Sequence, residues 1–333
     1  MGRRGTLAAL AVGAVAAGTT WTAVHRRDVA RLEADPHRHV LTDVPPGRPT
    51  GMTTRDGTHL HVRTHTPREP KAAVVFAHGW TMGIRFWMHQ LRALAPDHQV
   101  IAYDQRGHGG SGRVGDDGFS IDALGGDLFD VVDRFAHPDL PVTVVGHSLG
   151  GMSILAAARD GRLGDRASGA VLIDTGAGDL ASGMFRGLGV LEGLVSTVSA
   201  RAFRAKLPVP QRTTPISARA VRAVALNPTA SPAAVALTEQ LFLDCPVDAR
   251  ANVGLMLSDL DLSDALPRWK VPSTVVVGRR DRMTPLHHSQ RLVDELPDAE
   301  LIVVDRAGHQ SPIERPREVT TAIRQRVDRT VAA

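Results

Sequence analysis

The sequence predicts a doubly wound, mostly parallel α/β sheet that carries a helical cap. Short apolar runs rich in β-branched residues recur along the chain, and segments with helical spacing separate them. Runs that are apolar throughout are typical of strands buried on both faces of a parallel sheet. One long stretch, residues 176–264, interrupts this alternation. The alternating part is expected to form the sheet and its covering helices, and the interruption to form the cap.

The first element is an uncharged run over residues 5–24 with arginines on both sides. As a helix it would be about 30 Å long, the thickness of the hydrocarbon core of a bilayer. It is compatible with a signal anchor, with a signal peptide cleaved near Ala14-Val15-Ala16, or with a soluble helix. We therefore assign residues 1–35 to this segment and a linker. The prediction is a membrane-anchored or exported protein, with a cytoplasmic one as the alternative.

The sheet and its helices are expected over residues 36–175 and 265–333. Residues 28–50 are polar and rich in proline, which indicates a linker or an irregular approach. The stretch "MTTRDGTHLHVRTHTP" alternates around Asp56-Gly57 and predicts a β-hairpin. Six strands should follow, in "AAVVFAHG", "QVIAYDQRGHG", "PVTVVGHSLGG", "SGAVLIDTG", "PSTVVVGRRD" and "AELIVVDRAGH". Between them, "IDALGGDLFDVVDRFA" predicts a helix with Leu124, Leu128, Val131, Val132 and Phe135 on its buried stripe and Asp127 away from it.

The predicted cap, residues 176–264, has helical spacing interrupted by prolines and contains no clear buried strand. No acidic residue occurs from Gly193 to Thr238, although six basic residues do. This pattern indicates either a solvated face of the cap helices or a surface that meets anionic lipid.

The segment Gly146-His147-Ser148-Leu149-Gly150 matches the pattern G-x-S-x-G between a predicted strand and a helical segment. A serine on such a strand–turn–helix junction is held in a strained turn, and glycines on either side let the strand and the helix approach closely. This context predicts Ser148 as a nucleophile, with Gly146 and Gly150 as structural residues beside it.

A serine hydroxyl needs a base to accept its proton and an acid to orient that base. His309 and Asp281 each follow directly after a predicted strand, at the edge of the sheet where ligands bind. Asp174 and Asp305 are alternative acids, because they also lie at strand ends. A tetrahedral intermediate further needs two backbone N–H donors, which we assign to Leu149 and to Trp80. In the loop before Trp80, Gly79 permits a tight turn, and His78 is expected to brace the loop by hydrogen bonding. The side chain of Trp80 either forms a wall of the acyl pocket or has only a packing role.

These motifs together resemble the α/β-hydrolase superfamily. The matching pieces are "HGW", "YDQRGHGGSG", "GHSLGG", "GRRDRMTP" and "AGHQSPIERP", within residues 51–316 outside the predicted cap. The resemblance implies the same catalytic serine, acid, base and oxyanion donors. It also implies a structural turn formed by Asp104, Arg106, Gly107 and His108. The chain is similar to serine esterase and monoacylglycerol-lipase-like members, which implies hydrolysis of a carboxylic ester with a hydrophobic acyl group.

Two kinds of alternative stay open at this point. The same triad serves C–C bond hydrolases and perhydrolases or cofactor-free haloperoxidases, and the fold also occurs in non-catalytic binding proteins. The expected partner is a small-molecule ester, with no metal or cofactor, and membrane association would run through residues 5–24. Nucleic-acid binding is disfavoured, because the net charge is only +4, aromatic residues make up 4%, and zinc-finger spacing is absent from the sequence. The single cysteine, Cys245, excludes an intramolecular disulfide.

Overall fold

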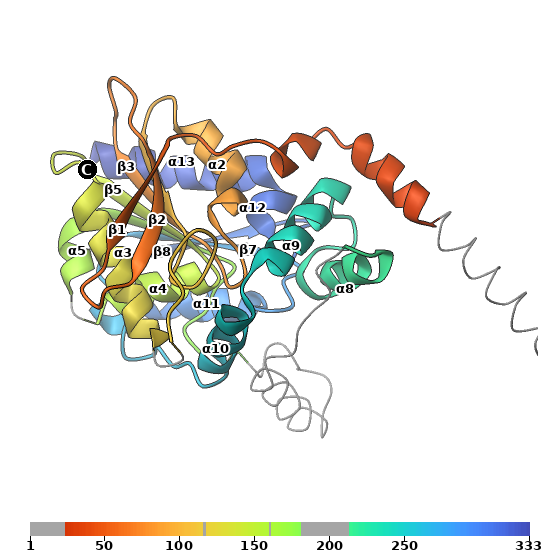
Figure 1. Ribbon diagram of the computed structural model, residues 1–333. Coiled ribbons are helices and arrows are strands. Elements are labelled where there is room, and N and C mark those ends of the chain that lie inside the picture. The colour runs from red at the N-terminus through yellow and green to blue at the C-terminus, as the bar shows by residue number, and fades with distance from the viewer. Residues whose placement is uncertain (1–23, 116–117, 160, 181–212) are drawn as a thin grey trace, which may run out of the picture.

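The computed structural model describes residues 24–115, 118–159, 161–180 and 213–333 (Figure 1). Within them the strands form one eight-stranded sheet of order β1-β2-β4-β3-β5-β6-β7-β8. The neighbouring pairs from β4 to β8 are parallel, whereas β1 pairs antiparallel with β2, and β2 with β4. The predicted fold class is therefore confirmed.

All of the predicted strands are present. They are β1 (Arg48–Thr53), β2 (His59–His65), β3 (Ala73–Ala77), β4 (Gln99–Tyr103), β5 (Val142–His147), β6 (Gly169–Ile173), β7 (Ser273–Gly278) and β8 (Ala299–Val304). The hairpin predicted around Asp56-Gly57 joins β1 to β2. Every residue of β3 to β7 is buried, as expected for strands covered on both faces. β8 is mostly half-buried because it forms one edge of the sheet.

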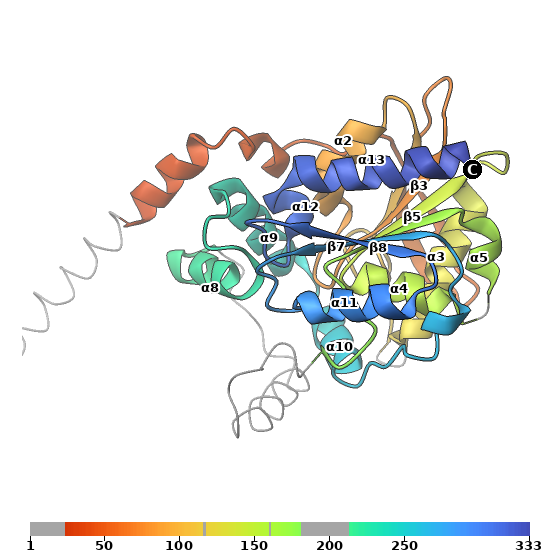
Figure 2. The ribbon, with the colours of Figure 1, turned by 180° about the vertical axis from the view of Figure 1, so that it is seen from behind.

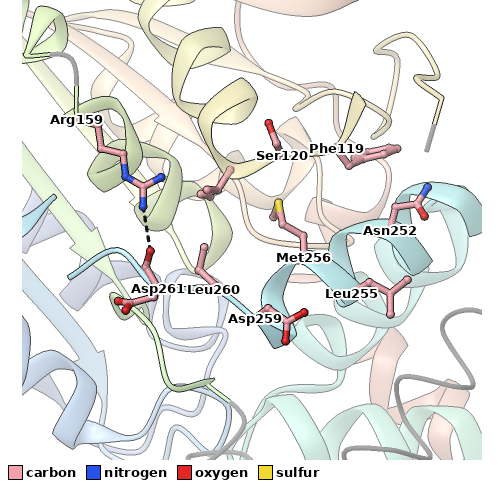
Figure 3. Close-up of a pocket in the computed structure, with 10 residues that line it drawn as sticks. Phe119, Ser120, Arg159, Asn252, Leu255, Met256, Asp259, Leu260 and Asp261 are labelled. Carbon is pink, nitrogen blue, oxygen red and sulfur yellow. Dashed lines mark hydrogen bonds between the residues drawn. The ribbon is translucent and has the colours of Figure 1, made fainter. Parts of the chain in front are cut away.

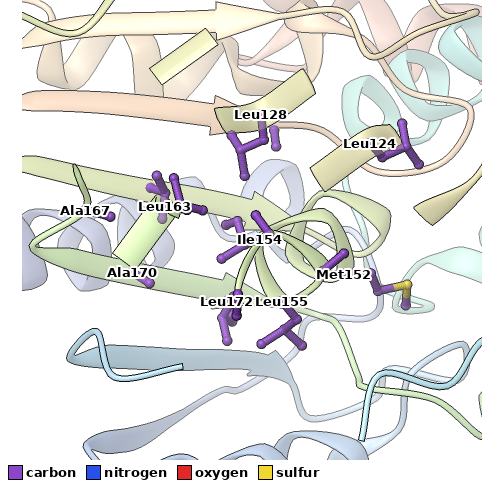
Figure 4. Packing of buried hydrophobic residues seen from close by; sticks show 14 of the residues in the cluster. Leu124, Leu128, Met152, Ile154, Leu155, Leu163, Ala167, Ala170 and Leu172 are labelled. Carbon is purple, nitrogen blue, oxygen red and sulfur yellow. The ribbon is translucent and has the colours of Figure 1, made fainter. Parts of the chain in front are cut away.

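Helices cover both faces of the sheet (Figures 1 and 2). One face carries α2 (Met88–Leu94) and α13 (Pro316–Ala332), and the other carries α3 (Ile121–Phe135), α4 (Leu149–Ala157) and α11 (Leu286–Glu295). The remaining helices in this part are η1 (Arg38–Leu41), η2 (Ile84–Trp87), α5 (Arg162–Arg166), η5 (Leu266–Arg268) and α12 (Ser311–Glu314). Side chains of β3 alternate between two hydrophobic clusters, with Val75 in the cluster under α3 and α4 (Figure 4) and Phe76 in the cluster under α2 and α13. This alternation is why the strand is apolar at every position.

Helix α3 buries the predicted leucines and valines, but it also buries Asp127, which we expected to lie away from the stripe. The Asp127 side chain is 2% exposed and accepts two hydrogen bonds of 2.7 Å from the Arg106 guanidinium. A buried carboxylate is tolerated when it is paired in this bidentate way. The pair ties α3 to the turn that follows β4.

The predicted cap is mostly helical where the structure describes it. Helices α8 (Pro215–Ala225), α9 (Pro232–Asp244) and α10 (Val247–Ser258) occupy it, and residues 181–212 lie outside the described residues. The division of the chain at residues 35, 175 and 264 stays a prediction.

The N-terminal approach is more regular than expected, since residues 24–33 form a helix where a linker was predicted from residue 28. No proline occurs in this stretch before Pro36, so nothing in it breaks the helix. Asp28 lies 3.3 Å from Arg219 of α8, and Asp35 accepts a 2.8 Å hydrogen bond from the N–H of Ala233 in α9. Most of the apolar run over residues 5–24 lies outside the described residues. Within the described ranges, no helix combines the length and the apolar character needed to span a bilayer.

Replacing Gly150 by alanine is expected to destabilise the fold. A Cβ at this position would lie 2.1 Å from the carbonyl oxygen of Ala77 in β3, and backbone cannot move aside cheaply. We expect the free energy of unfolding to fall by about 1–3 kcal/mol or more, measured by urea denaturation. Gly126→Ala on α3 is the control, because its Cβ would meet open space and should stabilise the helix by up to about 1 kcal/mol. Equal effects of the two substitutions would contradict the steric argument.

Candidate active site

Ser148 lies at the junction between β5 and α4 in a strained backbone conformation. Its φ is 50° and its ψ is −116°, a combination that a residue with a side chain rarely adopts. The turn is held by its own N–H, which donates to Ile173 of β6 at 2.9 Å, and by Thr175, whose hydroxyl donates to the Ser148 carbonyl at 2.7 Å. A Cβ on Gly146 would lie 2.5 Å from the backbone of Gly150. The close crossing of strand and helix therefore requires the glycines that the sequence analysis singled out.

The structure brings Ser148, His309 and Asp281 into one line of contacts. The Nε2 atom of His309 is 3.0 Å from the Oγ atom of Ser148, and its Nδ1 atom is 2.8 Å from the Oδ2 atom of Asp281. All three residues are buried, with 8% or less of each exposed. Asp281 follows β7 and His309 follows β8, so both reach the site from the carboxyl edge of the sheet, as the sequence predicted.

Neither rival acid occupies the position beside the Nδ1 atom of His309. Asp305 lies on the surface and pairs with Arg279. Asp174 is completely buried, but its two oxygens accept backbone N–H groups from Gly278, at 2.8 Å, and Ser311, at 3.0 Å. Because Gly278 precedes the loop of Asp281 and Ser311 follows His309, Asp174 holds the two loops together. Sequence reasoning weighed this residue only as an acid.

Two further residues that the sequence analysis did not assign hold the loop of His309. Glu314 accepts hydrogen bonds from the N–H groups of Gly308, at 2.8 Å, and of Asn227 in the cap, at 2.7 Å. The Nε2 atom of His147 donates to the carbonyl of His309 at 2.7 Å. Both residues lie inside quoted motifs, "GHSLGG" and "AGHQSPIERP", but the patterns give no partner for either.

The loop after β3 is fixed by two neutral histidines. His78 donates through Nδ1 to the carbonyl of Gly79 at 2.8 Å and accepts through Nε2 from the N–H of Gln105 at 2.9 Å. His108 accepts through Nε2 from the N–H of Thr81 at 3.3 Å. Burial lowers the pKa of His78, and it lowers the pKa of His108 to about 4, so neither ring is charged at neutral pH.

This brace reaches the helix that begins after Ser148. The side-chain amide of Gln105 donates to the carbonyl of His78 at 2.5 Å, and its oxygen accepts from the hydroxyl of Ser153 on α4 at 3.0 Å. A Cβ on Gly79 would lie 2.5 Å from the Nδ1 atom of His147, so the loop passes directly against the residue before the nucleophile. Trp80 is half-buried and packs against the hydrophobic cluster under α4.

The turn after β4 holds the same loop from the other side. Asp104 accepts hydrogen bonds from the N–H groups of Ile84, at 2.8 Å, and Gly110, at 2.9 Å, and from the ring of His61, at 2.8 Å. Gly107 has a φ of 76°, and a Cβ there would lie 2.6 Å from the ring of Phe119. The turn is structural, as the family resemblance implied.

The activity is expected to fall on the acid side with a midpoint above pH 6.5. Burial alone would lower the pKa of His309, but the charge and hydrogen bond of Asp281, and the charge of Asp174, raise it above the ordinary value of 6.5. A general base must be neutral, so activity is lost as the pH falls through this raised pKa. The pH profile of kcat/KM on an ester measures it, and a midpoint below 6.5 would contradict the assignment. The buried His78, His108 and His147 cannot account for this limb, because burial lowers their pKa values.

Two hollows lie apart from these three side chains. One of about 470 Å³ lies between the start of α3 and α10 (Figure 3), where Arg159 donates to the carbonyl of Asp261 at 2.9 Å. The other, of about 1400 Å³, lies between the N-terminal helix, α8 and α9. Among the described residues, no three or more His, Cys, Asp or Glu side chains are grouped so that they could hold a metal ion.

The contacts of Ser148, His309 and Asp281, the strained turn and the braced loop all lie in a part of the chain that matches a known family. Residues 74–322 match the profile of the Alpha/beta hydrolase family. The chain belongs to the alpha/beta hydrolase family. This span contains Ser148, His309, Asp281 and the loop after β3.

Individual members of the alpha/beta hydrolase family resemble this chain over most of its length. A putative carbamate hydrolase, RutD, from Variovorax paradoxus is 30% identical over 75% of this chain and 89% of the relative. The 3-oxoadipate enol-lactonase 1 of Acinetobacter baylyi is 25% identical over 80% of this chain and 92% of the relative. A thermophilic esterase from Thermogutta terrifontis superposes with a TM-score of 0.69, at 23% identity, over 85% of this chain and 99% of its own. The chain is thus a hydrolase of the alpha/beta fold.

Proposed function

We propose that the protein hydrolyses a carboxylic ester, with a hydrophobic acyl group, through an acyl-enzyme on Ser148. The observation that carries this proposal is the line of contacts from Ser148 Oγ through both ring nitrogens of His309 to Asp281. In this arrangement a hydroxyl, a base and a buried carboxylate meet at hydrogen-bond distance. The Alpha/beta hydrolase match and the enol-lactonase relative support it, since a lactone is a cyclic ester.

The first half of the reaction forms the acyl-enzyme. The Nε2 atom of His309 takes the hydroxyl proton while Ser148 Oγ attacks the ester carbonyl. Asp281 holds the Nδ1 proton and stabilises the charged ring. The tetrahedral intermediate then expels the alcohol, which receives the proton from His309, and the acyl group stays on Ser148.

Water completes the cycle by the same steps. His309 takes a proton from the attacking water, the second tetrahedral intermediate collapses, and the carboxylic acid leaves as Ser148 regains its proton. In both halves the negative oxygen needs backbone donors, which we assign to the N–H groups of Leu149 and Trp80. Leu149 is the first residue of α4, where N–H groups have no acceptor within the helix. The hydrogen bonds through His78, Gln105 and Ser153 would keep the loop of Trp80 at a fixed position relative to the start of α4.

A carbamate is the second candidate substrate, because the carbamate hydrolase relative is 30% identical over most of both chains. The same attack on the carbamate carbonyl would break the C–N bond and expel an amine, protonated by His309, in place of an alcohol, and water would then release the carboxyl group from Ser148. The two substrates differ in the leaving group, so a substrate panel separates them.

The test is covalent labelling followed by a substrate panel on the full chain. A fluorophosphonate probe should label the wild-type protein at Ser148, as located by peptide mass spectrometry. An acyl-length series of p-nitrophenyl esters should then be turned over faster than carbamates, vinylogous diketones, or peroxide with a carboxylic acid. A lack of labelling would favour a non-catalytic binding protein, and labelling without ester turnover would favour one of the other reactions.

A further inference from the structure

Helix α8 has apolar side chains on both of its faces. Ala218, Val221 and Ala225 face inward and pack against the hydrophobic cluster under α2 and α13. Ile216 and Val224 point outward and are 69% and 55% exposed. The exposed Ala220 lies between them, so the three residues follow the i, i+4, i+8 spacing of a single stripe. A surface helix needs only its inward face to be apolar, since that face packs on the core. The outward apolar stripe therefore indicates that α8 also contacts something outside the protein.

The charges around this stripe are mostly basic, with Asp28 and Glu33 of the N-terminal helix as the acidic exceptions. Arg219 is exposed on the same face of α8, three residues after Ile216. The N-terminal helix, residues 24–33, adds the exposed Arg26, Arg27 and Arg31. The 3.3 Å contact between Arg219 and Asp28 brings the two helices together. No acidic residue lies between residues 193 and 238, so α8 itself carries no negative charge. An apolar stripe bordered by arginines is the chemistry of a helix that lies among anionic headgroups.

The place of the N-terminal helix beside α8 favours a bilayer over a protein as the partner. Figures 1 and 2 both place the N-terminal helix and α8 at one end of the molecule, and the C-terminus at the opposite end. Residues 5–24, which lead directly into this helix, are uncharged. Arg219 of α8 and Arg31 of the N-terminal helix line the same hollow, so an anionic surface over this end would face an arginine from each helix.

We propose that this end of the protein docks on anionic phospholipid bilayers. The docking surface consists of Ile216, Arg219, Ala220 and Val224 of α8 with Arg26, Arg27 and Arg31. The apolar side chains enter the headgroup boundary, and the arginines bind the phosphates. Because the N–H of His309 donates to the carbonyl of Ala225 at 2.9 Å, the docked helix ends beside the candidate active site. Docking itself does not rest on the proposed ester hydrolysis.

The test places a polarity-sensitive nitrobenzoxadiazole probe on the docking surface of the full chain. Ile216→Cys carries the probe, and Val331→Cys, 44% exposed near the C-terminus, is the matched control. The sole native cysteine, Cys245, is 6% exposed, so the unsubstituted chain serves as the labelling blank. Both variants also carry Ser148→Ala, which keeps the readout independent of catalysis.

With vesicles of mixed phosphatidylcholine and phosphatidylglycerol, the probe at position 216 should shift its emission to the blue and brighten. The probe at position 331 should not change. Pure phosphatidylcholine or high salt should weaken the shift, because the attraction is electrostatic in part. The proposal is overturned if the two positions respond alike, or if position 216 does not respond. It is also overturned if position 216 is already blue-shifted without vesicles, which would mean that this chain or a second copy covers α8.

Discussion

Ester turnover by the Ser148→Ala variant is expected to fall by roughly 10⁶-fold in kcat, the size of the loss seen when a triad serine is removed. The variant has no oxygen to attack the carbonyl, whereas Asp281 and His309 keep their contact. Folding should be nearly unaffected, since the hydroxyl of Ser148 makes no helix-capping hydrogen bond. Steady-state kinetics on a p-nitrophenyl ester measure the loss, and circular dichroism with urea denaturation checks the fold.

The matched control is Ser289→Ala, because Ser289 is also buried but lies on α11. Its turnover should remain at the wild-type value. If Ser148→Ala retained wild-type turnover while folded, Ser148 would not be the nucleophile and the acyl-enzyme mechanism would fail. Loss of activity in both variants would instead point to a general effect of removing a buried hydroxyl.

The sheet could be predicted from the sequence because its signals are local. Each of β3 to β7 is buried on both faces, so most of its residues are apolar without alternation, and the glycines flanking Ser148 mark the strand–helix crossing. The candidate triad follows from the same signals. His309 and Asp281 stand out among many histidines and aspartates because each comes just after a predicted strand, a position that Asp281 shares with Asp174 and Asp305.

The supporting contacts could not be predicted, because they join residues that are far apart in the chain. Asp174 meets Ser311, 137 residues later, and Glu314 meets Asn227, 87 residues earlier. Asp127 reads as a solvent-facing position on α3 until its partner Arg106 is known. A single sequence gives the spacing within an element, whereas these pairs depend on how the elements pack.

Replacing Asp281 by asparagine is expected to reduce kcat by about 10⁴-fold, the loss known when a triad aspartate is amidated. The surrounding hydrogen bonds determine how the amide would sit. The Oδ1 atom of Asp281 accepts the N–H groups of Met283, at 2.8 Å, and Thr284, at 2.9 Å. The amide oxygen must therefore take this position, which turns the NH₂ group toward the Nδ1 atom of His309.

An N–H donor facing Nδ1 favours the tautomer whose proton is on Nε2, and that tautomer cannot accept the proton of Ser148. The lost negative charge should also lower the pKa of His309, since Asp281 contributes most to raising it against burial. In the pH profile of the residual activity, the midpoint of the fall on the acid side should therefore lie at a lower pH than in the wild type. Asp305→Asn is the matched control and should leave both kcat and the pH profile unchanged, because Asp305 is exposed and pairs with Arg279. If Asp174→Asn lost all ester turnover while Asp281→Asn stayed active, Asp174 would be the acid that orients His309. Asp281 would then not have that role.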